Sequence, residues 1–183
     1  MRTTDDLKQE HRLIESVLSA LERSIQEPGR GSPVSHDFGE KLLDFLRGFV
    51  DRCHHAKEER YLFKRLESRG ISRETGLLSE ILHEHGEGRA HVRALASSWP
   101  GAAEGDLPAS NTFTEHARAY AKLLRVHIDK EDNRLFPIAD QTLSGADDAE
   151  LMDLFERLER EEIGEGVHEK YHQWAHAAAE NRH

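Results

Sequence analysis

The chain has 183 residues, of which 37% are hydrophobic and 33% are charged, a balance that favours amphipathic helices over a buried parallel sheet and one domain over several. Its formal net charge is −10, with 35 acidic and 25 basic residues and no long basic run, which argues against nucleic acid as a partner. The charged N-terminus lacks a signal sequence, no apolar run reaches the roughly 18 residues of a membrane span, and the single Cys53 excludes an internal disulfide. We therefore expect a cytoplasmic protein with no membrane partner.

The first helix is expected from about Thr4, which can cap it, to Gln26, just before Pro28-Gly29. Its apolar residues form one stripe, and His11 occupies a gap in that stripe. These apolar residues are Leu7, Ile14, Leu18, Leu21 and Ile25. His11 therefore faces inward, and a loop rich in Gly, Ser and Pro follows over residues 28–35.

The second helix is expected over residues 35–69, ending at Gly70, and the third from a cap at Ser72 to Ser98. Each carries polar residues on its inward ridge. On the second helix this ridge comprises Val50, His54, Glu58 and Leu62. On the third it comprises Leu78, Ile81, His85, Gly88, Val92 and Leu95. Steps of three and four are typical of a bundle seam.

A loop over residues 100–110 and a fourth helix over residues 111–135 are expected next, with Pro137 ending or kinking that helix. Its seam comprises Phe113, Tyr120, Leu124, His127 and Glu131. Four such helices predict an all-α, antiparallel up-down four-helix bundle over residues 1–140. Residues 141–183 are expected to form a helical extension packed on the bundle, with a helix over 146–162, a break at Gly164-Glu-Gly166 and a last helix to about Glu180.

One motif occurs twice in the chain. The stretch His54-His-Ala-Lys-Glu58-Glu-Arg-Tyr-Leu-Phe63 matches His127-Ile-Asp-Lys-Glu131-Asp-Asn-Arg-Leu-Phe136 at an offset of 73 residues. On a helix, a His and a Glu four residues apart lie one turn apart on the same face. Two copies with the same trailing Leu-Phe pair indicate two related helix pairs.

Inward-facing polar residues thus occur at one level on all four helices, namely His11, His54, Glu58, His85, His127 and Glu131. Burying imidazoles and carboxylates is costly unless they are satisfied, and a metal centre satisfies them. Four imidazoles with two carboxylates able to bridge favour two ions of iron or manganese. Zinc can also bind such ligands, although structural zinc favours closed tetrahedral sites. The plainer alternatives are His–Glu pairs on a solvated helix face and, for His11 and His85, hydrogen-bonded core histidines.

This residue set resembles the hemerythrin family, in particular the bacterial hemerythrin-like HHE cation-binding proteins. The phrases Glu84-His85-Gly-Glu-Gly-Arg89 and Lys130-Glu-Asp-Asn-Arg-Leu-Phe-Pro137 add to the resemblance, which covers about residues 4 to 140. It implies a non-haem centre of two iron ions bridged by Glu58, Glu131 and an oxo or hydroxo group. It also implies a small-molecule ligand, O2, NO or peroxide, at an open iron position.

The chain departs from the family pattern at Arg89, because oxygen carriers in the family have a fifth histidine there, four residues after the third-helix ligand. The position on the metal that this histidine would fill is then either vacant or taken by a ligand from elsewhere in the chain. Further candidates, as ligands or as partners behind the ligands, are His55, Glu59, Arg89, His168 and Tyr171. We expect His55 and Glu59 to lie one residue off the inward register, and Arg89 to pair with a carboxylate. His168 or Tyr171 closes the vacancy only if the tail folds over an end of the bundle.

We therefore expect a di-iron protein that binds or reacts with a small oxidant. The alternatives are an enzyme of iron homeostasis or of oxidative or nitrosative stress, which reduces peroxide or NO or supplies iron for repair, and a structural bundle without metal. No catalytic acid or base is identified outside the ligand set, so any turnover is redox chemistry at the metal.

Overall fold

The structure of the chain is a computed structural model that describes residues 1–26 and 32–180. These residues form helices and connecting turns in the order α1 (Arg2–Gln26), α2 (His36–Phe45), η1 (Leu46–His55), η2 (Glu58–Leu62), α3 (Phe63–Ser68), α4 (Leu77–Ala103), α5 (Leu107–Lys130), η3 (Glu131–Leu135), α6 (Phe136–Thr142), α7 (Gly145–Arg157), η4 (Leu158–Gly164) and α8 (Val167–Glu180). The elements η1 to η4 are π-helical segments.

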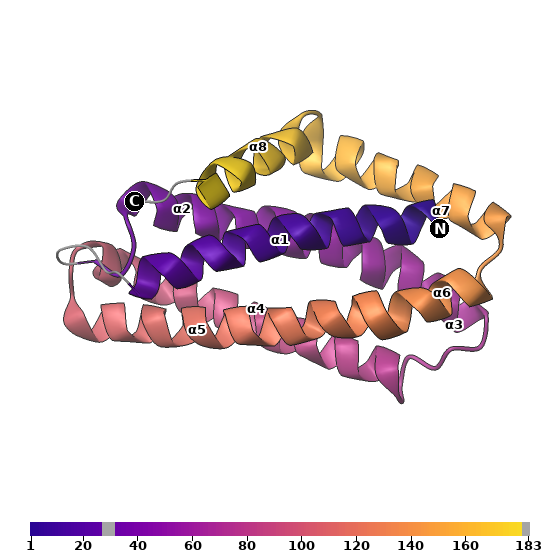
Figure 1. The fold of residues 1–183 in the computed structure, drawn as a ribbon, viewed down its shortest axis with the longest axis horizontal. Coiled ribbons are helices and arrows are strands. Elements are labelled where there is room, and N and C mark those ends of the chain that lie inside the picture. Colours follow the sequence, from indigo (N-terminus) through magenta and orange to yellow (C-terminus); the bar gives the residue numbers. More distant parts are fainter. Residues whose placement is uncertain (27–31, 181–183) are drawn as a thin grey trace.

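Four long helical rods lie side by side and alternate in direction (Figure 1). They are α1, the run from α2 to α3, α4, and the run from α5 to α6, so the expected antiparallel four-helix bundle with added C-terminal helices is confirmed. The second and fourth rods include π-helical segments that begin at equivalent residues of the repeat, Glu58 and Glu131. Such segments are frequent at functional sites.

Four of the expected helix ends are wrong. Helix α4 begins at Leu77 rather than near Ser72, because the Ser72 hydroxyl accepts the N–H groups of Glu74 and Thr75 in a turn. The expected loop over residues 100–110 is largely helical, since α4 continues through Pro100 and Asp106 caps α5. Of the two effects expected of Pro137, ending or kinking the fourth helix, the first is wrong, because η3 passes directly into α6 and the rod continues to Thr142.

The expected stop at Pro28-Gly29 and most of the loop around it lie outside the described residues. Within the described part, helix α1 ends at Gln26 and α2 begins at His36, where Ser35 accepts the N–H of Phe38 as a cap.

Buried polar side chains form a layer across the bundle, called the polar layer below, and it divides the apolar interior into two clusters. The layer comprises His11, His54, His55, Glu58, His85, His127 and Glu131. One cluster includes Ile14, Val50 and Leu95, and the other includes Leu7 and Leu62. Each fully buried aliphatic side chain contributes about 1.5–3 kcal/mol relative to exposure. The polar residues therefore sit in the middle of the bundle with apolar packing on both sides, rather than at an end.

The C-terminal helices run along one side of the bundle, where α7 and α8 lie over α1 (Figure 1). Helix α8 also meets the end of α2 and η1, where Tyr171 packs against Phe45 and Phe49 respectively. The contact requires Gly48, since a Cβ atom at this position would lie 1.9 Å from the Tyr171 hydroxyl oxygen. The division of the chain into domains at residue 140 stays a prediction. None of the described helices is long and apolar enough to cross a membrane.

Candidate metal centre

Two groups of buried His and Glu side chains meet in the polar layer and share Glu58. The first group comprises His11, His54, Glu58 and Glu131, and the second comprises His55, Glu58, His85 and His127. Each residue of a group offers one nitrogen or oxygen, and these atoms lie within 4.8 Å of one another, so each group could hold a metal ion. The structure thus brings together all six residues of the main sequence-predicted set. Because every one is buried, His–Glu pairs on a solvated helix face are excluded.

The histidines meet through their Nε2 atoms. These atoms are 3.0 Å apart in His11 and His54, and 3.1 Å apart in His85 and His127. Two metal–nitrogen bonds of about 2.1 Å at a right angle place their nitrogens about 3.0 Å apart, so both spacings fit ligands that share an ion. Without an ion, one N–H···N hydrogen bond accounts for each spacing.

Unsatisfied buried atoms test whether the residues fit metal ions. Both carboxylate oxygens of Glu58 and of Glu131, and both ring nitrogens of His55, are buried without a hydrogen-bond partner among the described residues. Leaving such groups unpaired costs about 1–3 kcal/mol each, and more for charged groups. Two cations placed among these oxygens and nitrogens would satisfy them, so the donor set fits a two-metal site.

A carboxylate lies behind four of the five histidines. Their Nδ1 atoms are within hydrogen-bond distance of an acidic side chain: His11 with Asp132 at 2.7 Å, His54 with Glu10 at 2.8 Å, His85 with Glu59 at 2.7 Å and His127 with Glu84 at 3.0 Å. A carboxylate at Nδ1 fixes the proton there and directs the Nε2 lone pair toward the centre.

Each of these carboxylates is held in turn by a cation. Asp132 pairs with Arg12, Glu10 with Lys57 at 2.7 Å, Glu59 with Arg89 at 2.7 Å and Glu84 with Lys130. The anchoring cations fix the carboxylates, which in turn orient the imidazoles, so the histidines are held in place before any ion binds.

The arrangement follows the internal repeat. Residues of the first copy that support the site are Asp6, Glu10, Lys57 and Glu59, and their equivalents 73 or 74 positions later are Glu80, Glu84, Lys130 and Asp132. The Lys57–Asp6 and Lys130–Glu80 pairs are also equivalent, at 3.0 and 3.4 Å. Sequence reasoning finds the ligands by this repeat and includes Glu59 among its further candidates, but it overlooks the other acids. The signal is present, because an acidic residue precedes both His11 and His85 and another follows both Glu58 and Glu131.

The two carboxylates of the ligand groups, Glu58 and Glu131, have opposite pKa shifts. Burial, and then the charge of Glu131, raises the pKa of Glu58 well above its usual range. Burial acts on Glu131 in the same sense, but His127 and His11 hold its pKa well below that range. One carboxyl group thus retains a proton beside an ionised partner, as expected where two acids share a site. Metal binding would displace this proton, because ligands must be deprotonated.

The expectation that His55 lies off the inward register is wrong. Its side chain is buried, and its ring stacks on that of His85 with 3.9 Å between ring centroids. The π-helical winding of η1 turns less per residue than an α-helix, which brings the neighbouring side chains of His54 and His55 closer in direction. Burial lowers the pKa of His55 to about 4. It is therefore neutral at pH 7 and able to offer a lone pair.

Glu59 and Arg89 lie behind the ligands. Glu59 is 21% exposed and supports His85, and the guanidinium of Arg89 contacts Glu59 and Asp51, each at 2.7 Å. Arg89 thus pairs with carboxylates, in agreement with the expectation for it. The aspartate beside His55 is Asp51, whose carboxylate is 3.7 Å from the imidazole, beyond a hydrogen bond.

His168 and Tyr171 belong to neither ligand group. His168 lies 3.0 Å from Glu10, and Tyr171 packs on η1, so the tail covers the side of the bundle rather than its end. A third group of potential ligands comprises Glu10, Cys53, Glu159 and His168. The ammonium of Lys57 lies 2.7 Å from Glu10 and 2.6 Å from Glu159, so a cation already neutralises this group.

Comparison with known proteins agrees with this site. The model of the hemerythrin HHE cation binding domain matches residues 2–139. The chain is also 25% identical over 161 residues to the uncharacterized proteins Rv1995 and MT2051 of Mycobacterium tuberculosis and Mb2018 of Mycobacterium bovis. The alignment covers 88% of this chain and 62% of each relative, so the chain spans less than two thirds of their length. No solved structure matches the chain. With the family match extending over most of its length, the chain belongs to the hemerythrin HHE cation-binding family.

Proposed function

We propose that the protein holds two iron ions in the polar layer and binds a small oxidant there, O2, NO or peroxide. The observation that carries the proposal is the burial of Glu58 and Glu131, whose four oxygens have imidazoles nearby but no hydrogen-bond partner among the described residues. Two carboxylates able to bridge, between two groups of imidazoles, supply ligands for two ions and offset part of their charge. Manganese or zinc can substitute at the same ligands.

The five histidines divide unequally between the two ions in this proposal. His11 and His54 hold one ion, while His55, His85 and His127 hold the other, so His55 takes the place of the histidine that Arg89 replaces. The ion with two histidines then has a position free for the oxidant. Bound iron supplies electron transfer to such an oxidant. The chain orients the ligands, and the apolar clusters on both sides exclude bulk water and large substrates.

Metal analysis of the full chain, purified without added metal, tests the proposal. We expect about two irons per chain in the parent and clear loss of iron in His54→Ala and in His127→Ala, because an ion held by only two or three imidazoles is bound much more weakly once one of them is removed. His83→Ala is the matched control, since this side chain is 77% exposed on the third rod. Full metal content in either test variant would contradict the ligand assignment.

We place binding ahead of turnover, because the buried polar residues around the ligands pair with them or with one another. Optical spectra distinguish the two. Reversible bleaching and recovery of the iron absorption band on O2 cycling supports a binding protein. Sustained loss of added peroxide, with many equivalents consumed per chain, supports the alternative of a stress-response enzyme.

A further inference from the structure

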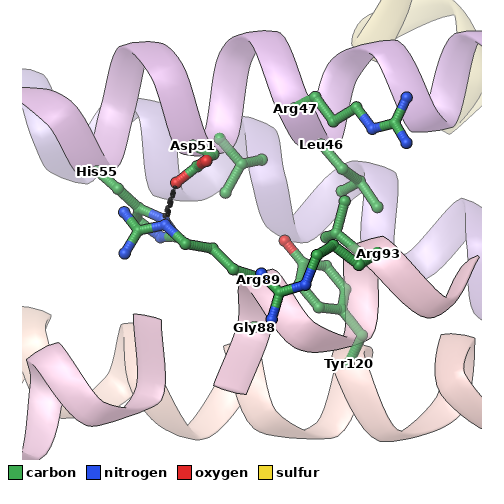
Figure 2. Close-up of a pocket in the computed structure, with 10 residues that line it drawn as sticks. Leu46, Arg47, Asp51, His55, Gly88, Arg89, Arg93 and Tyr120 are labelled. Atoms are coloured by element: carbon green, nitrogen blue, oxygen red, sulfur yellow. Dashed lines mark hydrogen bonds and ion pairs between the residues drawn. The ribbon is translucent and has the colours of Figure 1, made fainter. Parts of the chain in front are cut away.

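A cavity of about 150 Å³ lies between η1, α4 and α5, beside the three-histidine group. It is lined by Leu46, Arg47, Val50, Asp51, His55, Gly88, Arg89, Val92, Arg93 and Tyr120 (Figure 2). Of these, only His55 belongs to a ligand group. The cavity is therefore adjacent to the candidate metal centre but is built mainly from other residues.

The charge of the cavity is opposite to that of the whole chain. Three arginines and one aspartate line it, while the chain carries a formal charge of −10. Arg89 is neutralised by Asp51 and Glu59, but neither Arg47 nor Arg93 has a carboxylate within 4.0 Å among the described residues. A concave region in which one sign of charge predominates concentrates the opposite charge. This surplus of positive charge favours an anion.

The inner wall offers a neutral hydrogen-bond donor. Tyr120 is 1% exposed, and its hydroxyl forms no hydrogen bond within the part of the chain that the structure describes. Figure 2 shows this hydroxyl directed into the space between η1 and α4, with the guanidinium group of Arg93 on the same side. A hydroxyl that reaches the cavity without a protein partner is free to donate its proton to whatever occupies the cavity.

We propose that this cavity binds a small monovalent inorganic oxyanion, held by the guanidinium groups of Arg93 and Arg89 and by the Tyr120 hydroxyl. The volume corresponds to about five water molecules at roughly 30 Å³ each, which accommodates an ion of three or four heavy atoms. An apolar gas such as O2 gains nothing from guanidinium groups. The site goes beyond the proposed function, since none of these three residues is a metal ligand.

The test is a calorimetric titration of the full chain, as purified with its metal, with nitrite as the probe. We expect one saturable site per chain in the parent. Arg93→Met and Tyr120→Phe should each weaken binding about tenfold, because a hydrogen bond to a charged group is lost. Arg118→Met is the matched control, as it removes the same charge from an exposed position of α5 that does not line the cavity.

Three results would overturn the inference: no saturable nitrite binding in the parent, unchanged affinity in both cavity variants, or equal weakening in Arg118→Met. Unchanged affinity in the cavity variants means that nitrite binds elsewhere, for example at the metal. Metal content is measured on the same samples. Low iron content in the parent would contradict the metal-binding proposal alone, whereas the nitrite affinities of the variants test the anion site.

Discussion

The internal repeat divides the candidate centre into two similar halves. The first copy supplies His11, His54 and Glu58, and the second supplies His85, His127 and Glu131. The halves differ at one buried position beside the paired histidine. Both halves have a His–Glu pair four residues apart, a carboxylate behind each of two histidines and a lysine behind one carboxylate. The residue after the paired histidine is His55 in the first copy and Ile128 in the second, and both are buried. Only the first copy can therefore add a fifth imidazole, which makes a symmetric bundle into an asymmetric site.

The halves also differ in how they are covered. Lys57 is fully buried, beneath Glu159 and next to Glu10, whereas the equivalent Lys130 is 16% exposed. The C-terminal helices cover Glu10, the carboxylate behind His54, through His168. His55, in contrast, borders the arginine-lined cavity. An internal repeat thus duplicates ligands and their partners, and the elements outside the repeat decide which half is closed.

The largest difference is expected from removing the two equivalent lysines. Lys57→Met leaves the buried carboxylate of Glu10 without its cation, which should lower the free energy of unfolding by about 3–5 kcal/mol. Lys130→Met breaks a partly exposed pair and should cost less than about 1 kcal/mol. Urea unfolding followed by far-UV circular dichroism measures both. Equal losses would mean that the coverage by the C-terminal helices has no energetic effect.

A smaller effect is expected from the carboxylates behind the histidines, within the three-histidine half. Glu84→Gln removes the charged partner of His127 and should weaken metal affinity about 10- to 100-fold. Asp51→Asn should change it less than about threefold, because the Asp51 carboxylate lies 3.7 Å from the His55 imidazole and makes no hydrogen bond to it. Competition against a chelator of known affinity measures the two values. A larger loss in Asp51→Asn would show that His55 depends on Asp51 after all.

The smallest effect is a pH dependence that arises from His168, which lies over the covered half. Burial opposes the charging of His168, but Glu10 and Glu159 raise its pKa above the ordinary 6.5. A raised histidine pKa stabilises the fold fully below about pH 6.5, and the contribution is lost as pH rises through the folded value. The advantage of the parent over His168→Gln should therefore be largest below about pH 6.5, at about 0.2–1 kcal/mol, and should shrink toward zero over the range in which pH rises through the folded pKa. A constant difference across this range would exclude the charged form of His168 as its source.

Much of this molecule follows from periodicity. The spacing of apolar residues identifies the four rods, and the 73-residue repeat identifies His54, Glu58, His127 and Glu131 as an inward set. These predictions hold because a buried stripe and its polar interruptions are local properties of a helix.

The remainder depends on features that α-helical periodicity does not contain. The inward turn of His55 accompanies a π-helical segment, and a fixed spacing of 3.6 residues places this side chain on the wrong face. The sequence pattern also misses the continuation of α4 through Pro100, because neighbouring Pro and Gly residues are typical of loops. The contact of His168 with Glu10 spans 158 residues and depends on how the tail packs, which no local pattern specifies.

The polar layer has a mechanical consequence for the bundle. Since imidazoles and carboxylates interrupt the apolar interior, the two apolar clusters cannot support each other by direct side-chain packing across that plane. Ions bound to ligands from all four rods would link the two apolar clusters on either side of the polar layer. Occupancy of the centre would then decide whether the molecule melts as one unit or as two.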